Sequence, residues 1–275
     1  MLKRTISGAV YVAILVGIFL LRQFVDYRIF HLLTWFFTIV GTYELVRALD
    51  GKILPYTKWC AIGFAVLFVP IYALGEYFVF EGWGWLLALD LIALMIIATS
   101  IIALIDGADG MTFGCTALIY VYPALFLLTM LMANDLGENG FIALLMAFVV
   151  SPCSDTFAYL VGSLIGGKKL CPKLSPKKTW SGAIGGTVGG ILAGIIAYYI
   201  FTPQVNFFSP VLLFIMVGLL ASIANIFGDL FESYIKRRGG IKDMGNIMPG
   251  HGGVLDRIDG TMFAQVVIYV AFALV

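Results

Sequence analysis

The stretch WSGAIGGTVGGILAGIIAYYI, residues 180–200, shows which kind of fold the chain adopts. It contains no charged residue and is long enough to cross the apolar core of a bilayer as one helix, which takes about 20 residues. Gly182, Gly186, Gly190 and Gly194 recur every four positions and so share one helix face. A stripe of small residues lets another helix approach closely in lipid. We therefore expect a tightly packed membrane-spanning helix, although Gly185 and Gly186 could also let a ligand approach the backbone.

The composition of the whole chain points the same way. Of its 275 residues, 61% are hydrophobic and 12% are charged, and the mean hydropathy is +1.01. Soluble domains carry about 25% charged residues. We expect an all-α, polytopic membrane protein that forms a single integral-membrane domain over 1–275. The net charge of +1 argues against a nucleic-acid partner. The four cysteines show no CxxC pairing, which argues against disulfides or zinc.

The hydrophobic runs predict about nine transmembrane helices, with boundaries accurate to a few residues. The N-terminal run has Lys3 and Arg4 before it, as a signal peptide would, but no A-x-A-like cleavage site follows it. We interpret it as an uncleaved first helix. The expected spans are 5–21, 29–46, 59–75, 83–105, 111–133, 140–166, 180–202, 209–228 and 260–275.

The positions of the basic residues predict the orientation of these spans. With the N-terminus in the cytoplasm, all 17 Lys and Arg residues except Arg22 and Arg28 fall in cytoplasmic segments. Cytoplasmic loops of membrane proteins are enriched in Lys and Arg. We expect a multi-pass protein of the cytoplasmic membrane whose active site faces the cytoplasm.

Two basic segments, 167–179 and 229–259, are predicted to be cytoplasmic loops of a catalytic part that covers 150–260. The helices of 1–135 are expected to serve packing and oligomerisation, with a homodimer as one form that the chain could take. Basic loops also follow from topology alone. Lys168, Lys169 and Lys173 are therefore read as orientation determinants or lipid-headgroup contacts.

Paired carboxylates in the second segment suggest a metal site. Asp229 and Glu232 are three positions apart, as are Asp256 and Asp259, so each pair shares a face of a helical turn. Like charges at that spacing repel unless a cation lies between them. Mg²⁺ prefers oxygen ligands and often uses one or two carboxylates together with substrate phosphates. The predicted metal ligands are therefore Asp229, Glu232, Asp256 and Asp259.

Basic residues and glycines surround these acids. Arg side chains can bind two phosphate oxygens at once, and Lys acts as a point charge. The glycine-rich stretch PGHGG, 249–253, could turn its backbone N–H groups toward phosphate, with His251 reaching in. Together these features predict a metal–phosphate pocket at the membrane surface. The interleaved cations are Lys236, Arg237, Arg238, Lys242 and Arg257, with Lys173, Lys177 and Lys178 in the first segment.

Three acids lie inside apolar runs, where a carboxylate is costly and usually functional. Asp155 is nearest in sequence to the first basic segment and is predicted to be a site residue. Pro152 could open the helix there and leave carbonyls near Asp155. Asp90 and Glu44 are interpreted as polar groups in helix packing or at an interface.

The stretch SYIKRRGGIKDMGNIMPGHGGVLDRID, 233–259, resembles the signature of phosphatidate cytidylyltransferases, also called CDP-diacylglycerol synthases. Three shorter stretches resemble other blocks of that family: GDLFES (228–233), SPKKTWSGAIGG (175–186) and SDTFAY (154–159). The likeness is strong over about 150–260 and only general before that. Met248 and Pro152 depart from the usual residues of the family; Pro152 stands where Trp is common. The matching signature residues are Ser233, Lys236, Arg237, Lys242, Asp243, Gly245, Pro249, His251, Gly252, Gly253, Asp256, Arg257 and Asp259.

The resemblance implies a transferase that uses Mg²⁺ in phospholipid biosynthesis, with a second cation that could be monovalent. It would join the CMP moiety of CTP to phosphatidate and release pyrophosphate. The implied catalytic residues are Asp229, Asp256, Lys236, Arg237, His251 and Arg257, with Asp259 as a further cation ligand. The residues implied to bind phosphate or nucleotide are Ser175, Lys177, Lys178, Thr179, Lys242, Gly252, Gly253, Asp155 and Asn225, with Ser222 and Gly228 nearby.

Three alternatives remain at this point. A related cytidylyltransferase could act on another polyprenyl or ether-lipid phosphate. A CDP-alcohol phosphotransferase would show Asp-Gly-x-x-Ala-Arg, which is absent; DGADGMT at 106–112 has no Arg. A cation transporter that used Asp90 and Asp155 would predict inverted repeats, and the two halves of this chain are unlike.

Overall fold

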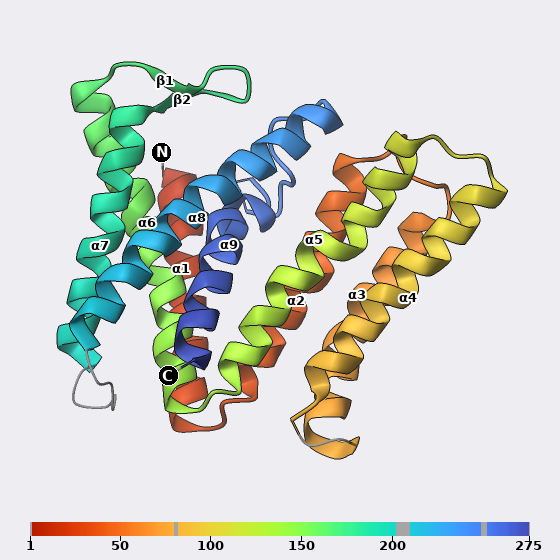
Figure 1. Cartoon of the computed structure of the whole chain (residues 1–275), viewed down its shortest axis with the longest axis horizontal. Helices are drawn as coiled ribbons and strands as arrows, with labels where there is room; N and C mark the ends of the chain where they lie inside the picture. The colour runs from red at the N-terminus through yellow and green to blue at the C-terminus, as the bar shows by residue number, and fades with distance from the viewer. Residues whose placement is uncertain (1, 80–81, 202–209, 249–251, 275) are drawn as a thin grey trace. The chain divides into compact units, whose positions relative to one another are not determined.

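The computed structural model describes residues 2–79, 82–201, 210–248 and 252–274 (Figure 1). Within these residues the chain forms nine α-helices, one π-helical turn (Gly75–Val79) and a two-stranded hairpin. The predicted all-α class is therefore confirmed. The elements are α1 Leu2–Phe24, α2 Ile29–Ala48, α3 Thr57–Leu74, α4 Gly84–Ile105, α5 Gly110–Asn134, α6 Glu138–Ile165, β1 Lys169–Cys171, β2 Ser175–Thr179, α7 Trp180–Phe201, α8 Pro210–Gly239 and α9 Leu255–Ala273.

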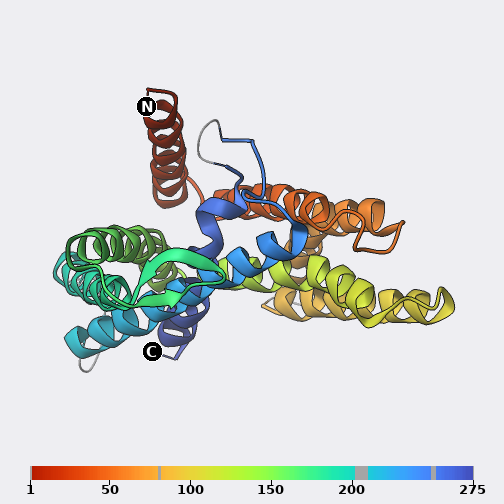
Figure 2. The ribbon, with the colours of Figure 1, turned by 90° about the horizontal axis from the view of Figure 1, so that it is seen from above.

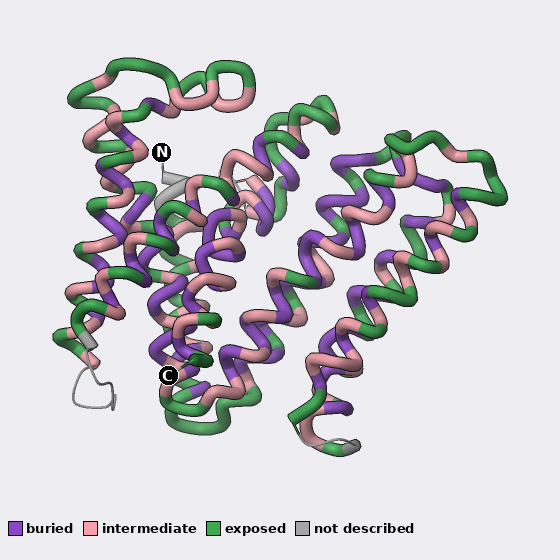
Figure 3. The backbone as a smooth tube through the Cα atoms, viewed as in Figure 1, coloured by how far each residue is buried: buried purple, intermediate pink, exposed green. Residues whose placement is uncertain are grey.

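The helices have the length and the surface of membrane spans. Eight of those described, α1 to α8, are long and apolar enough to cross a bilayer. Exposed residues run along the whole length of the helices (Figure 3), and many of them are large and apolar; the side chains of Leu104 and Leu164 are 82% and 84% exposed. Soluble monomers rarely expose contiguous apolar surface on this scale. The chain is therefore a polytopic membrane protein.

The chain folds into two compact units. The first contains Met1–Met132 together with Arg238–Asp256. In this unit α2 contacts both α1 and α3, and α3 contacts α4. Aromatic side chains fill its interior; for example, the rings of Phe64 and Tyr120 meet edge to face. The segment 238–256, which holds much of the signature-like stretch, thus belongs to the same unit as the N-terminal helices.

The second unit contains Ala133–Arg237 and Arg257–Val275. Figures 1 and 2 show α6 and α7 side by side, with the hairpin at one end of the pair. The glycine stripe explains this close packing. A Cβ atom on Gly186 would lie 3.0 Å from the carbonyl oxygen of Ser154 in α6, and one on Gly194 would lie 2.2 Å from that of Phe214 in α8. The predicted role of the stripe is confirmed. Gly185 and Gly186 are buried against α6, so they do not present backbone to a ligand.

The prediction of a loop over 229–259 is wrong at both ends. Helix α8 continues to Gly239, and α9 begins at Leu255. The extension of α8 buries Ile235 and Glu232 and contains a Lys236–Glu232 ion pair four positions apart, which stabilises a helix. Only 240–254 connects the two helices. Because α9 starts with Asp256, Arg257 and Asp259, it is not among the eight apolar spans.

The other predicted loop, 167–179, contains an antiparallel hairpin. Lys169 pairs with Thr179, and Cys171 pairs with Ser175. Gly166 and Gly167 have φ values of +66° and +99°, which only glycine adopts readily, and they turn the chain from α6 into β1. The expectation that Pro152 opens its helix is wrong: α6 runs unbroken through it, and the Thr156 hydroxyl donates to the Pro152 carbonyl over 2.7 Å.

Candidate active site

A cavity of about 420 Å³ lies in the second unit, between α6, the hairpin, α7 and α8. Its charged and hydroxyl-bearing lining includes Asp155, Lys177, Lys178, Thr179 and Asp229. All five are among the site residues predicted from the sequence. The structure therefore brings residues from three separate stretches of the chain to the wall of one cavity.

Glycines at the helix contacts form this wall. A Cβ atom on Gly162 of α6 would lie 2.9 Å from the Thr179 hydroxyl oxygen, and one on Gly182 of α7 would lie 2.8 Å from the Ala158 carbonyl oxygen. Both glycines line the cavity. Larger residues at these two positions would push α6 and α7 apart. The close packing of the two helices thus sets where Asp155 lies relative to β2.

Thr179 is the N-cap of α7. Its side-chain oxygen accepts the backbone N–H of Gly182 over 3.1 Å, which is the usual capping geometry. The cap ends β2 and starts the helix at the cavity wall, and the N-terminus of a helix favours anions. The hydroxyl of Thr179 was predicted to contact phosphate or nucleotide; the structure shows that its oxygen also holds the start of α7.

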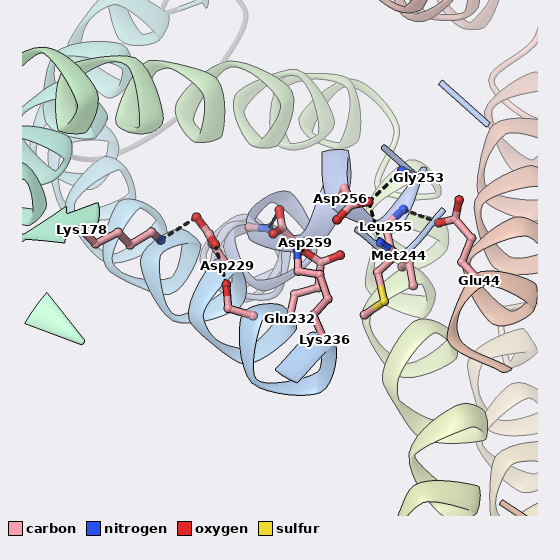
Figure 4. Close-up of polar contacts among 12 residues, drawn as sticks. Glu44, Lys178, Asp229, Glu232, Lys236, Met244, Gly253, Leu255, Asp256 and Asp259 are labelled. Carbon is pink, nitrogen blue, oxygen red and sulfur yellow. Dashed lines mark hydrogen bonds and ion pairs between the residues drawn. The ribbon is translucent and has the colours of Figure 1, made fainter. Parts of the chain in front are cut away.

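Acidic and basic side chains alternate around the cavity. Lys178 Nζ lies 2.5 Å from Asp229 Oδ2, joining β2 to α8 (Figure 4). Asn225 Nδ2 donates to Asp155 Oδ1 over 2.8 Å, joining α8 to α6. The charges of Asp229, Lys178 and Arg257 all act on the Asp155 carboxylate. The predicted assignment of Asp155, Asn225, Lys178, Asp229 and Arg257 to one region is therefore consistent with the geometry of this unit.

Close packing of α8 and α9 brings more carboxylates to this region. A Cβ atom on Gly228 would lie 2.5 Å from the Asp259 carbonyl oxygen, and one on Gly260 would lie 2.0 Å from Asn225 Oδ1. Asp259 lies at the start of α9 and interacts with both Glu232 and Asp229. Burial, and then the negative charge of Asp229, raise the pKa of Asp259 to about 6.

The carboxylates of this region would suit a metal ion that takes its remaining ligands from substrate phosphates. Among the described residues, no group of three His, Cys, Asp or Glu side chains is arranged to hold a metal ion. Asp229 and Glu232 instead contact Lys178 and Lys236, over 2.5 and 2.8 Å. Oxygen donors of this type suit Mg²⁺, which commonly takes one or two carboxylates plus substrate phosphates. Asp229, Glu232 and Asp259 thus offer oxygen donors of the type that Mg²⁺ prefers, but they do not form a metal site without further ligands.

The signature-like segment of the first unit is organised around Asp256. Its Oδ2 atom accepts the backbone N–H of Met244 over 2.9 Å and that of Gly253 over 2.7 Å (Figure 4). Gly252 has φ +87°, and a Cβ atom there would lie 2.6 Å from the same oxygen. Gly252 and Gly253 were predicted to bind phosphate; the structure shows that Gly252 makes room for Asp256, and that the Gly253 N–H donates to Asp256 within the chain.

The remaining predicted residues are placed as follows. Ser175 lies in the hairpin, and the Ser222 hydroxyl donates to the Leu219 carbonyl over 2.8 Å. Arg237 and Lys242 are exposed. His251, together with Pro249, lies outside the described residues.

Sequence reasoning missed the role of Glu44. This residue of α2 is buried, and its carboxylate accepts the backbone N–H groups of Val254 and Leu255, each over 2.9 Å (Figure 4). The only signal in the sequence was an acid within an apolar run. That signal identifies an unusual residue, but it does not reveal a partner more than two hundred positions away.

These features define the chain as a membrane-integral protein with a pocket lined by basic and acidic side chains. Residues 2–275 match the cytidylyltransferase family, and the chain belongs to this family.

Three curated relatives illustrate the likeness, and each is named a phosphatidate cytidylyltransferase. The protein of Brucella abortus is 34% identical over 199 residues, which cover 68% of this chain and 71% of that protein. The protein of Bacillus subtilis is 29% identical over 274 residues, covering 99% and 98%. A chloroplastic protein of Arabidopsis thaliana is 43% identical over 130 residues, covering 47% and 32%.

Proposed function

We propose that the chain transfers the CMP moiety of CTP to phosphatidate, giving CDP-diacylglycerol and pyrophosphate for phospholipid biosynthesis. The observation that carries this proposal is the cavity where Lys177, Lys178 and the start of α7 meet Asp155 and Asp229. Its volume of about 420 Å³ is within the usual range for a small-molecule site. Membership of the cytidylyltransferase family and the names of the relatives support it further.

The residues of the chain act by position and charge. The phosphate monoester of phosphatidate is itself the nucleophile, so no side chain has to be activated. Lys177 and Lys178 neutralise phosphate oxygens of CTP, and the α7 N-terminus favours the same anion. Holding the lipid phosphate in line with the α-phosphorus removes much of the entropic barrier. Charge that develops on the leaving pyrophosphate meets lysine side chains that are already in place.

Asp229 and Asp259, with Glu232 beside them, would hold Mg²⁺ together with the phosphates of CTP, and Asp256 is the fourth predicted ligand. When bound, Mg²⁺ supplies Lewis-acid stabilisation of charge on the phosphate oxygens. Asp155 and Asn225, joined over 2.8 Å, keep α6 and α8 in register beside this group. A second, monovalent cation is part of the same proposal.

The proposed location is the cytoplasmic membrane, with the cavity open to the cytoplasm. Support comes from the basic residues, since nearly all of them fall on one side of the predicted topology. This orientation suits the two substrates, because CTP is soluble and the phosphatidate headgroup lies at the membrane surface. A homodimer remains a prediction, which the mass of the purified protein in detergent can check.

The experiment is a turnover assay on the full chain purified in detergent, with CTP labelled at the α-phosphate, phosphatidate micelles and Mg²⁺. We expect label in the lipid phase and one pyrophosphate released for each CDP-lipid formed. Absence of both products from folded protein would overturn the proposal. Polyprenyl phosphate and ether-linked phosphatidate, offered in parallel at the same surface concentration, distinguish the lipid substrates by their values of kcat/KM.

A further inference from the structure

The carboxylate of Glu44 connects an N-terminal helix to the signature-like segment. Glu44 lies on α2 and is 1% exposed. Its Oε1 accepts the N–H of Val254 and its Oε2 accepts that of Leu255, each over 2.9 Å. Both oxygens are thus used, and both hydrogen bonds go to backbone rather than to side chains. All of these residues belong to the first compact unit.

The two N–H groups are at the beginning of α9, which starts at Leu255. The first N–H groups of a helix have no partner within the helix and must be satisfied from outside. Side chains from the preceding residues usually do this. Here the acceptor comes from another helix, and its negative charge suits the positive end of the helix dipole. Glu44 therefore determines where α9 begins.

Two glycines show that the segment is built around this carboxylate. A Cβ atom on Gly245 would lie 2.2 Å from Glu44 Oε1, and one on Gly253 would lie 2.4 Å from the same atom. Gly41, one turn before Glu44 on α2, meets the Leu255 side chain, since a Cβ atom there would lie 3.1 Å from Leu255 Cδ2. The backbone at Gly245 and Gly253 thus lies so close to the Glu44 carboxylate that a residue with a Cβ atom would clash with it.

The segment held by Glu44 leads directly to Asp256, which the sequence predicts to bind a cation. Asp256 directly follows Leu255, and its Oδ2 accepts the N–H of Gly253, the residue packed against Glu44. A shift of the backbone at 253–255 would therefore move the Asp256 carboxylate with it. Both hydrogen bonds that Glu44 accepts here come from main-chain N–H groups, those of Val254 and Leu255.

We infer that Glu44 is a positioning residue for the transfer reaction: it fixes the backbone of 253–255 and so sets the place of Asp256. The inference rests on the proposed function, and it gives the N-terminal half of the chain a part in catalysis. Groups that orient functional ligands from a second layer are typically worth about tenfold to a hundredfold in activity.

The first test compares Glu44→Gln and Glu44→Asp with Asp90→Asn, which removes an exposed acid from α4. Gln can accept only one of the two N–H groups, and Asp is one methylene too short to reach both. We expect kcat to fall about tenfold to a hundredfold in the Glu44 variants. We expect the KM for CTP to change less than about threefold, and kcat to stay near wild type in Asp90→Asn. Wild-type kcat in folded Glu44→Gln would overturn the inference.

The second test uses the clash between Gly253 and Glu44. Gly253→Ala alone should lower kcat at least about tenfold, because its Cβ atom would displace the carboxylate. In a Glu44→Ala background the same change should lower kcat by no more than about threefold further, since the clashing group is gone. Equal losses in both backgrounds would show that the two residues act independently. If Glu44→Ala does not fold, Glu44→Asp serves as the background.

Hydrogen exchange at the Val254 and Leu255 amides separates this inference from the proposed function, because it needs no substrate. We expect faster exchange at both amides in Glu44→Gln, while exchange in the middle of α6 stays unchanged. If the wild-type chain makes no CDP-lipid, the proposed function fails, while exchange still reports whether Glu44 holds the segment. Unchanged exchange in Glu44→Gln would overturn the positioning role whatever the activity.

Discussion

Lys178 Nζ lies 2.5 Å from Asp229 Oδ2. This ion pair joins strand β2 of the hairpin to helix α8. Both side chains are partly exposed, at 26% and 33%, and both line the cavity. The pair keeps the ammonium group of Lys178 at the cavity wall. Position, rather than charge alone, therefore distinguishes Lys178 from Lys168 and Lys169, which do not line the cavity.

Lys178→Ala should be far more damaging than Lys168→Ala. Loss of a preorganised contact to developing charge costs about 2–4 kcal/mol, which corresponds to a loss of about 30-fold to 1,000-fold in rate. Lys168 is exposed beside Gly167, and its loss should cost less than about tenfold. The measurement is kcat/KM for CTP of both variants in the same detergent. If Lys168→Ala is equally damaging, the phosphate site does not lie at β2.

Asp256→Asn should abolish turnover but leave the protein folded. The amide keeps the shape and can still accept the N–H groups of Met244 and Gly253, but it removes the charge expected to bind a cation. Activity and the thermal midpoint are measured on the same preparation, with Lys169→Gln as a control that should be mild. Turnover near that of wild type in a folded variant would contradict the metal role.

Turnover should require Mg²⁺ or a similar divalent cation. The acidic cluster of Asp229, Glu232 and Asp259 is only partly neutralised by lysines, and a polyphosphate adds further negative charge. Excess EDTA should stop product formation, and added Mg²⁺ should restore it. Replacing K⁺ with a large organic cation at constant Mg²⁺ tests for the second cation. Undiminished turnover in EDTA would be incompatible with the proposal.

Gly194→Ala should destabilise the second unit. Its added methyl group would meet the Phe214 carbonyl oxygen at 2.2 Å, so α7 and α8 would have to separate. Overpacking of this kind costs about 1–3 kcal/mol. The matched control is Gly63→Ala on α3, where no atom lies within 4 Å of the new methyl group. Thermal midpoints in detergent should fall for Gly194→Ala and remain level or rise for Gly63→Ala; equal midpoints would argue against the close contact.

Thr179→Ala should weaken the start of α7 by about 1 kcal/mol, the usual loss for a removed N-cap. Thr179→Ser retains the oxygen that accepts the Gly182 N–H and should behave like the wild type. Exchange of the Gly182 amide measures the cap directly, and KM for CTP shows whether the hydroxyl also contacts substrate. A Ser variant as weak as the Ala variant would mean that the methyl group, and not the cap, matters.

Much of this protein could be predicted from local patterns. Apolar runs marked the membrane helices because a span has to hide its backbone from lipid over a known length. The glycine stripe from Gly182 to Gly194 predicted close helix contacts for the same local reason. Helix α8 was predicted to end near Gly228 because charged residues follow there, but Glu232 and Lys236 pair along the helix and carry it on to Gly239.

The residue types and spacings of the sequence by themselves determined the all-helical membrane class and the family, and they predicted acids and lysines that line the cavity. These properties depend on hydropathy, charge and motif, which are properties of neighbouring residues. Only the tertiary structure decided that Lys178 meets Asp229, that Gly253 makes room for a carboxylate, and that this carboxylate is Glu44. Such contacts join residues far apart in the chain, and they arise from helix packing that no local pattern encodes.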